Sequence, residues 1–359
     1  MITNLPLKKA EALVEKILQP TPQQLSQAEW SCLLQAAGEN KDLATTIRQK
    51  ASALRDKHFG KAVYLRGLIE VSNICAKDCF YCGIRRSNSK VKRYRLSKEE
   101  ILACCSQGER LNLHTFVLQS GEDASLTDSY LVDLIKEIKA RHPQCAVTLS
   151  LGERSAQSYQ KLFEAGADRY LLRHEAASAE LFAKLKPAES SLANRMRCLQ
   201  DLKAIGYQVG CGFMVGAPYQ TWQDLAADFC FIQQFKPHMV GIGPFIPHKD
   251  TPFANFSAGS LDTTLNCLAL LRLSLPKVLL PSTTALATLS PQGRILGMNC
   301  GCNVVMPNLS PLQHRSDYTL YDNKAFLNTE SAEGVSKLSQ ELERFGYFID
   351  YSRGDAQPQ

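Results

Sequence analysis

From Val63 onward, short apolar runs alternate with longer helical segments, and this alternation restricts the fold more than any other feature of the chain. The apolar runs lie at 63–71, 115–118, 146–151, 168–172, 208–212, 239–242, 277–280 and 303–306. Helix-like stretches separate them, at 97–111, 126–141, 192–205, 221–235 and 260–273 among others. This order predicts an α/β fold with a parallel sheet, and eight units are what a closed (β/α)8 barrel of the TIM type requires. An open doubly wound sheet is the alternative, but no Gly-rich dinucleotide-binding turn follows the first run.

Two further segments flank the predicted barrel. Residues 1–60 are expected to be helices that pack on the barrel, and Ser26 with Glu29 forms a capping-box pattern that would open the second helix. Residues 61–310 are expected to form the barrel itself. The more polar residues 311–359 are expected to pack on it as a C-terminal extension of loops and a helix.

Composition excludes several classes of protein. At 45% hydrophobic and 21% charged residues, the 359-residue chain has enough apolar content for a large core, and its net charge of +6 is mild. Its local basic cluster, residues 85–95, is predicted to be an anion-facing loop rather than a nucleic-acid surface. No apolar run approaches the roughly 18 residues that cross a bilayer. The first 18 residues form an amphipathic helix pattern, not a signal peptide.

The chain has 13 cysteines at irregular spacing, and an odd count without a secretory leader argues against a disulfide framework. A reducing cytoplasm is therefore the expected location. Cys75, Cys79 and Cys82 are separated by four and three positions and directly follow the first apolar run. Three thiolates at this spacing can hold one side of an iron–sulfur cube and leave the fourth iron without a protein ligand. That iron can chelate the amino and carboxylate groups of a substrate such as S-adenosylmethionine (SAM).

A structural zinc site is the alternative reading of the cysteines. Closed zinc sites have four ligands, usually from two paired half-sites. Neither the adjacent pair Cys104 and Cys105 nor the distant pair Cys300 and Cys302 makes a convincing second half-site for zinc. The other ten cysteines are expected to be small buried hydrophobes.

Polar residues follow the remaining predicted strands at the end of a barrel where chemistry takes place. They come after successive runs in chain order, and a glycine among them would let a ligand approach the backbone. The polar residues are Ser120 and Glu122, then Glu153, then Arg173, His174 and Glu175, then His248, Thr283 and Thr284, with Gly121 and the apolar Met214 among them.

The motif CxxxCxxC after the first barrel strand resembles that of the radical SAM superfamily. Within the superfamily the chain is similar to the HydE family of FeFe-hydrogenase maturases, relatives of biotin synthase and methylornithine synthase. The matching stretches include GLIEVSNICAKDCFYCGIRRSN, KRYRLSKEEI, FVLQSGED, VTLSLGE, GADRYLLRHE, MVGIGPFIPHKDTPFAN, STTA and NVVMPN, across roughly residues 67–308. The cysteine motif specifies only the superfamily, whereas LLRHE and GIGPFIPH indicate HydE and its nearest relatives.

The resemblance implies roles for the rim residues, each with a simpler alternative. Glu153 and Arg173 would contact SAM, or would pair with each other. Ser120, Gly121 and Glu122 would hold the amino-acid end of SAM. The backbone of Tyr81 would read the adenine, or its ring would lie on the surface. Met214 would pack on the adenine or fill core space, and Thr283 and Thr284 would hold an anionic substrate or be ordinary strand residues.

The resemblance also implies cofactors, partners and a reaction. One 4Fe-4S cluster would cleave SAM reductively to a 5′-deoxyadenosyl radical, and a ferredoxin or flavodoxin would supply the electron. The substrate would be a cysteine-bound iron carbonyl–cyanide complex, with HydG and HydF as partner maturases. Some HydE proteins have a second cluster on three C-terminal cysteines; residues 321–337 contain no cysteine, so a single cluster is predicted.

Three other functions remain open on sequence grounds. An amino-acid mutase similar to methylornithine synthase keeps the radical chemistry and changes the substrate. A sulfur-inserting enzyme similar to biotin synthase would need an arginine deep in the barrel for its auxiliary cluster, and none is evident in the sequence. A non-catalytic scaffold that only carries metal is the third, and cleavage of SAM on reduction would exclude it.

Overall fold

A closed barrel of parallel strands forms the centre of the computed structural model, which describes residues 5–19, 23–323 and 334–357. Six strands pair in chain order, each parallel to the next. They are β2 (Gly67–Ser72), β3 (Thr115–Ser120), β4 (Ala146–Ser150), β5 (Arg169–Leu171), β6 (Gln208–Cys211) and β8 (Met239–Val240).

Shorter pairings close the ring. Met239 bridges Leu279, and Pro281 bridges Val304 of β10 (Val304–Val305). The chain then returns to the first strand, where Leu68 N–H donates to the Pro307 carbonyl at 2.8 Å. The eight segments confirm the predicted (β/α)8 barrel and exclude the open sheet, because an open sheet would leave β2 and β8 as unpaired edges.

The first apolar run is one barrel segment interrupted at Arg66. It contains β1 (Ala62–Leu65) and β2, and β1 pairs with β10 on one side and β11 (Phe348–Asp350) on the other. A two-stranded pair, β7 (Met214–Val215) with β9 (Gly243–Pro244), continues past the ends of β6 and β8.

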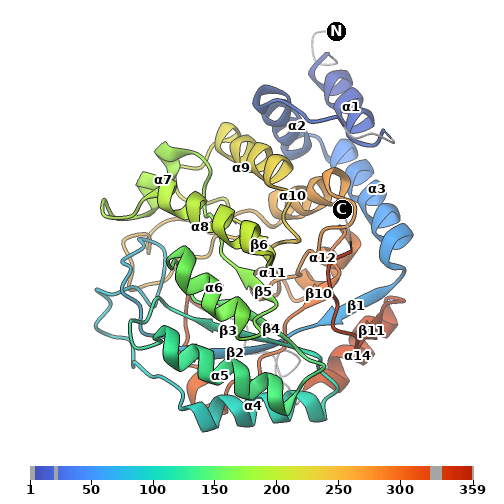
Figure 1. Ribbon diagram of the computed structural model, residues 1–359. Helices are drawn as coiled ribbons and strands as arrows, with labels where there is room; N and C mark the ends of the chain where they lie inside the picture. Colours follow the sequence, from blue (N-terminus) through green and yellow to red (C-terminus); the bar gives the residue numbers. More distant parts are fainter. Residues whose placement is uncertain (1–4, 20–22, 324–333, 358–359) are drawn as a thin grey trace.

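Helices cover the barrel (Figure 1). Most of them begin at a Ser or Thr cap. Caps form because the hydroxyl accepts a hydrogen bond from an otherwise unpaired N–H in the first helical turn. The helices after the strands are α4 (Lys98–Arg110), α5 (Asp128–Arg141), α6 (Ala156–Glu164), α7 (Ala179–Leu185), α8 (Leu192–Ile205), α9 (Trp222–Phe235), α10 (Leu261–Ser274), α11 (Thr284–Leu289) and α12 (Gly293–Asn299). None of the helices in the described residues is both long and apolar enough to cross a membrane.

Three N-terminal helices are α1 (Leu5–Ile17), α2 (Gln27–Glu39) and α3 (Lys41–Phe59). The second packs on α9 and α10, the third packs on α10, and α1 packs on α2 and α3 (Figure 1). The predicted capping box of Ser26 and Glu29 is present at the start of α2. Trp30 of α2 is fully buried, and its ring centre lies 4.6 Å from that of Phe229 in a tilted arrangement. Its indole N–H donates to Gln233 at 2.7 Å. Burial of this aromatic side chain fixes α2 against α9.

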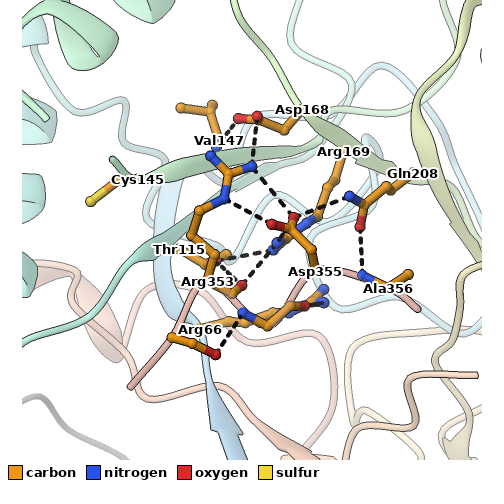
Figure 2. A network of polar contacts seen from close by, with 12 residues as sticks. Arg66, Thr115, Cys145, Val147, Asp168, Arg169, Gln208, Arg353, Asp355 and Ala356 are labelled. Carbon is orange, nitrogen blue, oxygen red and sulfur yellow. Dashed lines mark hydrogen bonds and ion pairs between the residues drawn. The ribbon is translucent and has the colours of Figure 1, made fainter. Parts of the chain in front are cut away.

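The C-terminal segment contains α13 (Leu312–Arg315), α14 (Val335–Arg344) and β11. The sequence predicted loops and a helix there, and the strand β11 was missed. After β11 the chain crosses the end of the barrel where β3, β5 and β6 begin (Figure 2). Thr115 at the start of β3 donates to the Arg353 carbonyl at 2.8 Å, and Gln208 at the start of β6 donates to Asp355 at 3.0 Å.

Two arginines bind Asp355 in this network (Figure 2). Arg169, whose side chain is 3% exposed, contacts the carboxylate at 2.6 Å, and Arg353 contacts it at 2.9 Å. Burial raises the pKa of Asp355, but the two guanidinium groups outweigh burial and hold the pKa well below its ordinary value. Asp355 therefore stabilises the fold above pH 3.8, and this contribution is lost as the pH falls through the lowered pKa.

We expect Asp355→Asn to lower the free energy of unfolding by about 1–2 kcal/mol at pH 7, because buried Arg169 would lose its charged partner. The difference from wild type should shrink as the pH falls below 3.8, when Asp355 itself becomes neutral. Urea unfolding at several pH values measures both effects. Glu180→Gln removes an exposed ion pair with Lys184 and should change stability by less than about 0.5 kcal/mol.

Candidate active site

A cavity of about 380 Å³ lies at the C-terminal ends of the barrel strands, the end that carries the chemistry in this architecture. Of the twelve predicted site residues, Glu153 is absent from the lining, so its predicted contact with SAM stays a prediction. The other eleven line the cavity: Cys75, Cys79, Tyr81, Cys82, Ser120, Gly121, Glu122, Arg173, Met214, Thr283 and Thr284.

The three cysteines lie in the loop after β2. All three are free, half-buried thiols. Asp78, between the first two, accepts hydrogen bonds from Arg85 Nε at 2.8 Å and from the Ser87 N–H at 2.9 Å. These bonds fold the loop onto itself, so the sulfur atoms project from a backbone that is already fixed.

This donor set fits an iron–sulfur cube. Burial raises the pKa of the Cys75 and Cys82 thiols, although the N–H groups of Glu122 and Lys77 lower that of Cys75. A thiolate in such surroundings needs a cationic partner, which iron supplies. In the described part of the chain, no three His, Cys, Asp or Glu side chains are placed to hold a single metal ion. The thiolates of a cube each bind a different iron, so they need not converge on one point.

The basic cluster after the cysteines mostly serves the loop itself. Arg85 pairs with Asp78, Arg95 pairs with Asp123 at 2.7 Å, and Arg93 donates to four backbone carbonyls. The prediction of an anion-facing loop is wrong for these three arginines, because their guanidinium groups hold the loop in place.

The Ser120–Gly121–Glu122 turn at the end of β3 packs against the cysteine loop. The Glu122 N–H donates to Cys75 Sγ at 3.3 Å, and the Ala76 N–H donates to the Glu122 carbonyl at 2.9 Å. A Cβ atom at Gly121 would lie 2.4 Å from the Ile74 carbonyl oxygen and 2.6 Å from Cys75 Cβ. Only glycine therefore allows the two segments to approach this closely.

We expect Gly121→Ala to displace the cysteine loop and lower the iron content after reconstitution by about 10-fold, the range seen when groups that orient metal ligands are disturbed. Iron and acid-labile sulfide assays measure this loss. Gly346→Ala is a stringent control, because nothing lies within 4 Å of its Cβ position, and its φ of +77° adds a backbone cost that Gly121→Ala does not have. Equal iron contents in the two variants would contradict the packing argument.

Four charged side chains form a cluster beside the cysteines. Lys77 lies 3.1 Å from Glu153 and 3.6 Å from Glu122. Arg195 at the start of α8 lies 2.8 Å from Glu153. Burial raises the pKa of Glu153, but Arg195 and Lys77 outweigh burial and lower it. The predicted pairing of Glu153 with Arg173 is therefore wrong, because Arg195 and Lys77 occupy that carboxylate.

Arg173 instead pairs with Glu175 at 3.1 Å at the end of β5. Its Nε and Nη2 atoms, and Glu175 Oε2, are buried and make no hydrogen bond of good geometry. Both side chains line the cavity, so they present polar atoms that a ligand can satisfy. His174, between them, is fully buried and lies 3.1 Å from Asp228 of α9, away from the cavity lining.

The two threonines do not end a strand. Thr283 precedes α11 and Thr284 is its first residue, so their alternative role as ordinary strand residues is wrong. The Thr283 hydroxyl is buried without a hydrogen-bond partner and lines the cavity. Met214 is buried on the short strand β7, and the half-buried Tyr81 packs against the same apolar cluster, so its ring is not simply a surface aromatic.

Three cations that line the cavity were missed from sequence: Lys77, Lys186 and Arg195. Lys77 lies inside the cysteine motif itself. Arg195 is in the first turn of a predicted helix that follows a barrel strand, and the start of such a helix lies near the active end of the barrel. Lys186 follows the seven-residue helix α7, which is too short to give a clear periodic pattern.

Comparison with known proteins agrees with the geometry. Residues 69–231 match the Radical SAM superfamily. The chain is 48% identical over 296 residues to the FeFe hydrogenase maturase subunit HydE of Thermotoga maritima, and the match covers 82% of this chain and 84% of that protein.

Two solved structures share the fold. Methylornithine synthase (PylB) superposes with a TM-score of 0.80 at 24% identity, covering 94% of this chain and 97% of that one. The FeFe-hydrogenase maturase HydG from Carboxydothermus hydrogenoformans superposes with a TM-score of 0.79 at 20% identity, covering 96% and 80%. The match to HydE, at 48% identity, is much higher than the identities of the two solved structures and therefore gives the family. The chain belongs to the HydE family and is a radical SAM enzyme, with a 4Fe-4S cluster and SAM as its cofactors.

Proposed function

We propose that this chain cleaves SAM reductively in the cavity at the C-terminal end of its barrel. The resulting 5′-deoxyadenosyl radical would act in assembly of the H-cluster of FeFe hydrogenase. The observation that carries the proposal is the convergence on one cavity of three cysteine thiols and the Arg173–Glu175 ion pair, in which Arg173 Nε has no hydrogen-bond partner. The identity of 48% to HydE supports the maturation role over that of the more distant relatives.

Cys75, Cys79 and Cys82 would each hold one iron of a single cluster. When bound, the cluster supplies the electron that breaks a C–S bond of SAM. Residues 321–337, where some HydE proteins hold a second cluster, contain no cysteine. Of these, residues 324–333 lie outside the part of the chain that the structure describes.

The other rim residues would bind and orient SAM. The Ser120–Gly121–Glu122 turn would hold its amino-acid end, because this turn already contacts the cysteine loop. Arg173 would contact SAM through Nε, which has no hydrogen-bond partner, while Nη2 stays paired with Glu175. The Tyr81 backbone would read the adenine, and Met214 would pack on it. Glu153 would act beside them by holding Lys77 and Arg195.

The substrate would be a cysteine-bound iron carbonyl–cyanide complex, enclosed in the barrel below SAM. Thr283 would donate its unpartnered hydroxyl to an anionic group of this complex, with Thr284 beside it. HydG would supply the complex and HydF would receive the product, while a ferredoxin or flavodoxin would supply electrons. The oxygen-sensitive thiolates favour a reducing cytoplasm as the location.

The test is substrate stimulation of SAM cleavage. The protein is reconstituted with iron and sulfide without oxygen, reduced with dithionite and given SAM, and 5′-deoxyadenosine is measured. The iron carbonyl–cyanide cysteine complex, lysine and dethiobiotin are added in parallel. Stimulation by the iron complex alone is expected; stimulation by lysine would indicate a mutase, and stimulation by dethiobiotin would indicate a sulfur-inserting enzyme.

A further inference from the structure

Lys186 is a buried cation beside the cysteine loop. The residue is 4% exposed, and its Nζ lies 3.3 Å from Cys79 Sγ. The ammonium group also lies 5.6 Å from the ring centres of Tyr81 and Phe182. In the described ranges, Cys79 Sγ is the one hydrogen-bond acceptor of this ammonium, and no carboxylate lies within ion-pair distance.

The other cavity cations are neutralised by carboxylates. Lys77 lies 3.1 Å from Glu153, and Arg195 lies 2.8 Å from the same side chain. Lys186 has only the sulfur atom and two aromatic faces. Because a buried ammonium is costly unless it is paired, this geometry directs the charge of Lys186 to the ligand sulfur rather than to a carboxylate.

The backbone fixes Lys186 at this position. Its N–H donates to the Phe182 carbonyl at 3.1 Å and ends α7. The carbonyl of the preceding residue, Leu185, accepts a hydrogen bond from the Phe80 N–H at 3.1 Å. The end of α7 is therefore bonded to the residue after Cys79. The distance between ammonium and sulfur is therefore set by two rigid segments and not by a mobile side chain alone.

We propose that Lys186 is a positioning residue that donates a hydrogen bond to the Cys79 thiolate in the assembled centre and thereby raises the reduction potential of the cluster. The inference rests on the proposed function, because it assumes the cluster on Cys79. An external one-electron reductant adds one negative charge to the cluster. A fixed positive charge and an N–H donor at a ligand sulfur stabilise the reduced form more than the oxidised form.

The test is a redox titration of the reconstituted protein, followed by electron paramagnetic resonance, with iron content measured in parallel. Lys186→Met keeps the length of the side chain and removes both charge and donor. We expect a roughly tenfold smaller equilibrium constant for reduction, which for a one-electron couple is a potential about 59 mV lower. Lys186→Arg should retain most of the wild-type potential. Lys184→Met, two residues away on the exposed face, should leave the potential unchanged.

An unchanged potential in Lys186→Met with full iron content would overturn the inference, as would weaker SAM binding in place of a potential shift. If Lys186→Met did not hold iron, Lys186→Gln would be titrated instead. A reduction potential below that of wild type supports the inference, and an unchanged potential overturns it. A wild-type protein that forms no SAM-cleaving cluster would contradict the proposed function itself, and this outcome is seen before any variant is compared.

Discussion

Cys79→Ala is expected to lose its cluster and its SAM cleavage together. The cavity offers the iron three sulfur ligands, and removing one leaves a second iron without a protein donor. Because even groups that only orient metal ligands cost about 10- to 100-fold, loss of a ligand should lower 5′-deoxyadenosine formation by more than about 100-fold. Iron content, the visible absorption of the cluster and product formation are measured on the same sample.

Cys32→Ala is the matched control for this variant. Cys32 is a half-buried free thiol on α2, remote from the cysteine loop in the fold. It should retain wild-type iron content and activity, which separates loss of a ligand from loss of any thiol. Wild-type product formation by Cys79→Ala would remove the cluster assignment.

Arg195→Met is expected to lower the free energy of unfolding by about 3 kcal/mol, because it leaves the carboxylate of Glu153 buried with one cation instead of two. The side chains of Arg195 and Glu153 are 9% and 11% exposed, so water cannot replace the lost partner. Chemical unfolding monitored by circular dichroism measures the loss. SAM binding should weaken as well, because Arg195 lines the cavity.

The pH dependence of this variant follows from the lowered pKa of Glu153. The carboxylate stabilises the wild-type fold above its ordinary pKa of 4.5, and this contribution is lost as the pH falls through the lowered value. The stability difference between wild type and Arg195→Met should therefore be largest near neutral pH and shrink in acid. Arg141→Met, which breaks an exposed pair with Glu137 on α5, should cost less than about 0.5 kcal/mol. Equal losses in the two variants would show that the buried cluster has no special role.

The barrel could be predicted because alternation of apolar runs and helical stretches survives in the sequence. The predicted stretch 192–205 matches α8 at both ends, since Ser191 caps its start and Gly206 ends it in a left-handed conformation. The sequence did not delimit the short helices α6, α7, α11 and α12, because six to nine residues give too few turns for a clear helical period. For the same reason the sequence placed Thr283 and Thr284 at a strand end, whereas they begin α11.

The candidate site was predictable where its residues are adjacent in sequence. Cys75, Cys79 and Cys82 form a local motif, and Gly121 is flanked by polar residues after an apolar run. Contacts that join distant segments gave no such signal. Lys186 and Cys79 are 107 positions apart, and the pairing of Glu153 with Arg195 depends on how α8 follows β5. Only the folded chain brings these charges together.

The most direct test of the account is the yield of 5′-deoxyadenosine from SAM by the reconstituted, dithionite-reduced protein, with iron counted in the same sample. We expect four irons per chain and 5′-deoxyadenosine that appears only when both SAM and reductant are present. A protein that holds the cluster, is fully reduced and still forms no 5′-deoxyadenosine would contradict the claim that this cavity cleaves SAM.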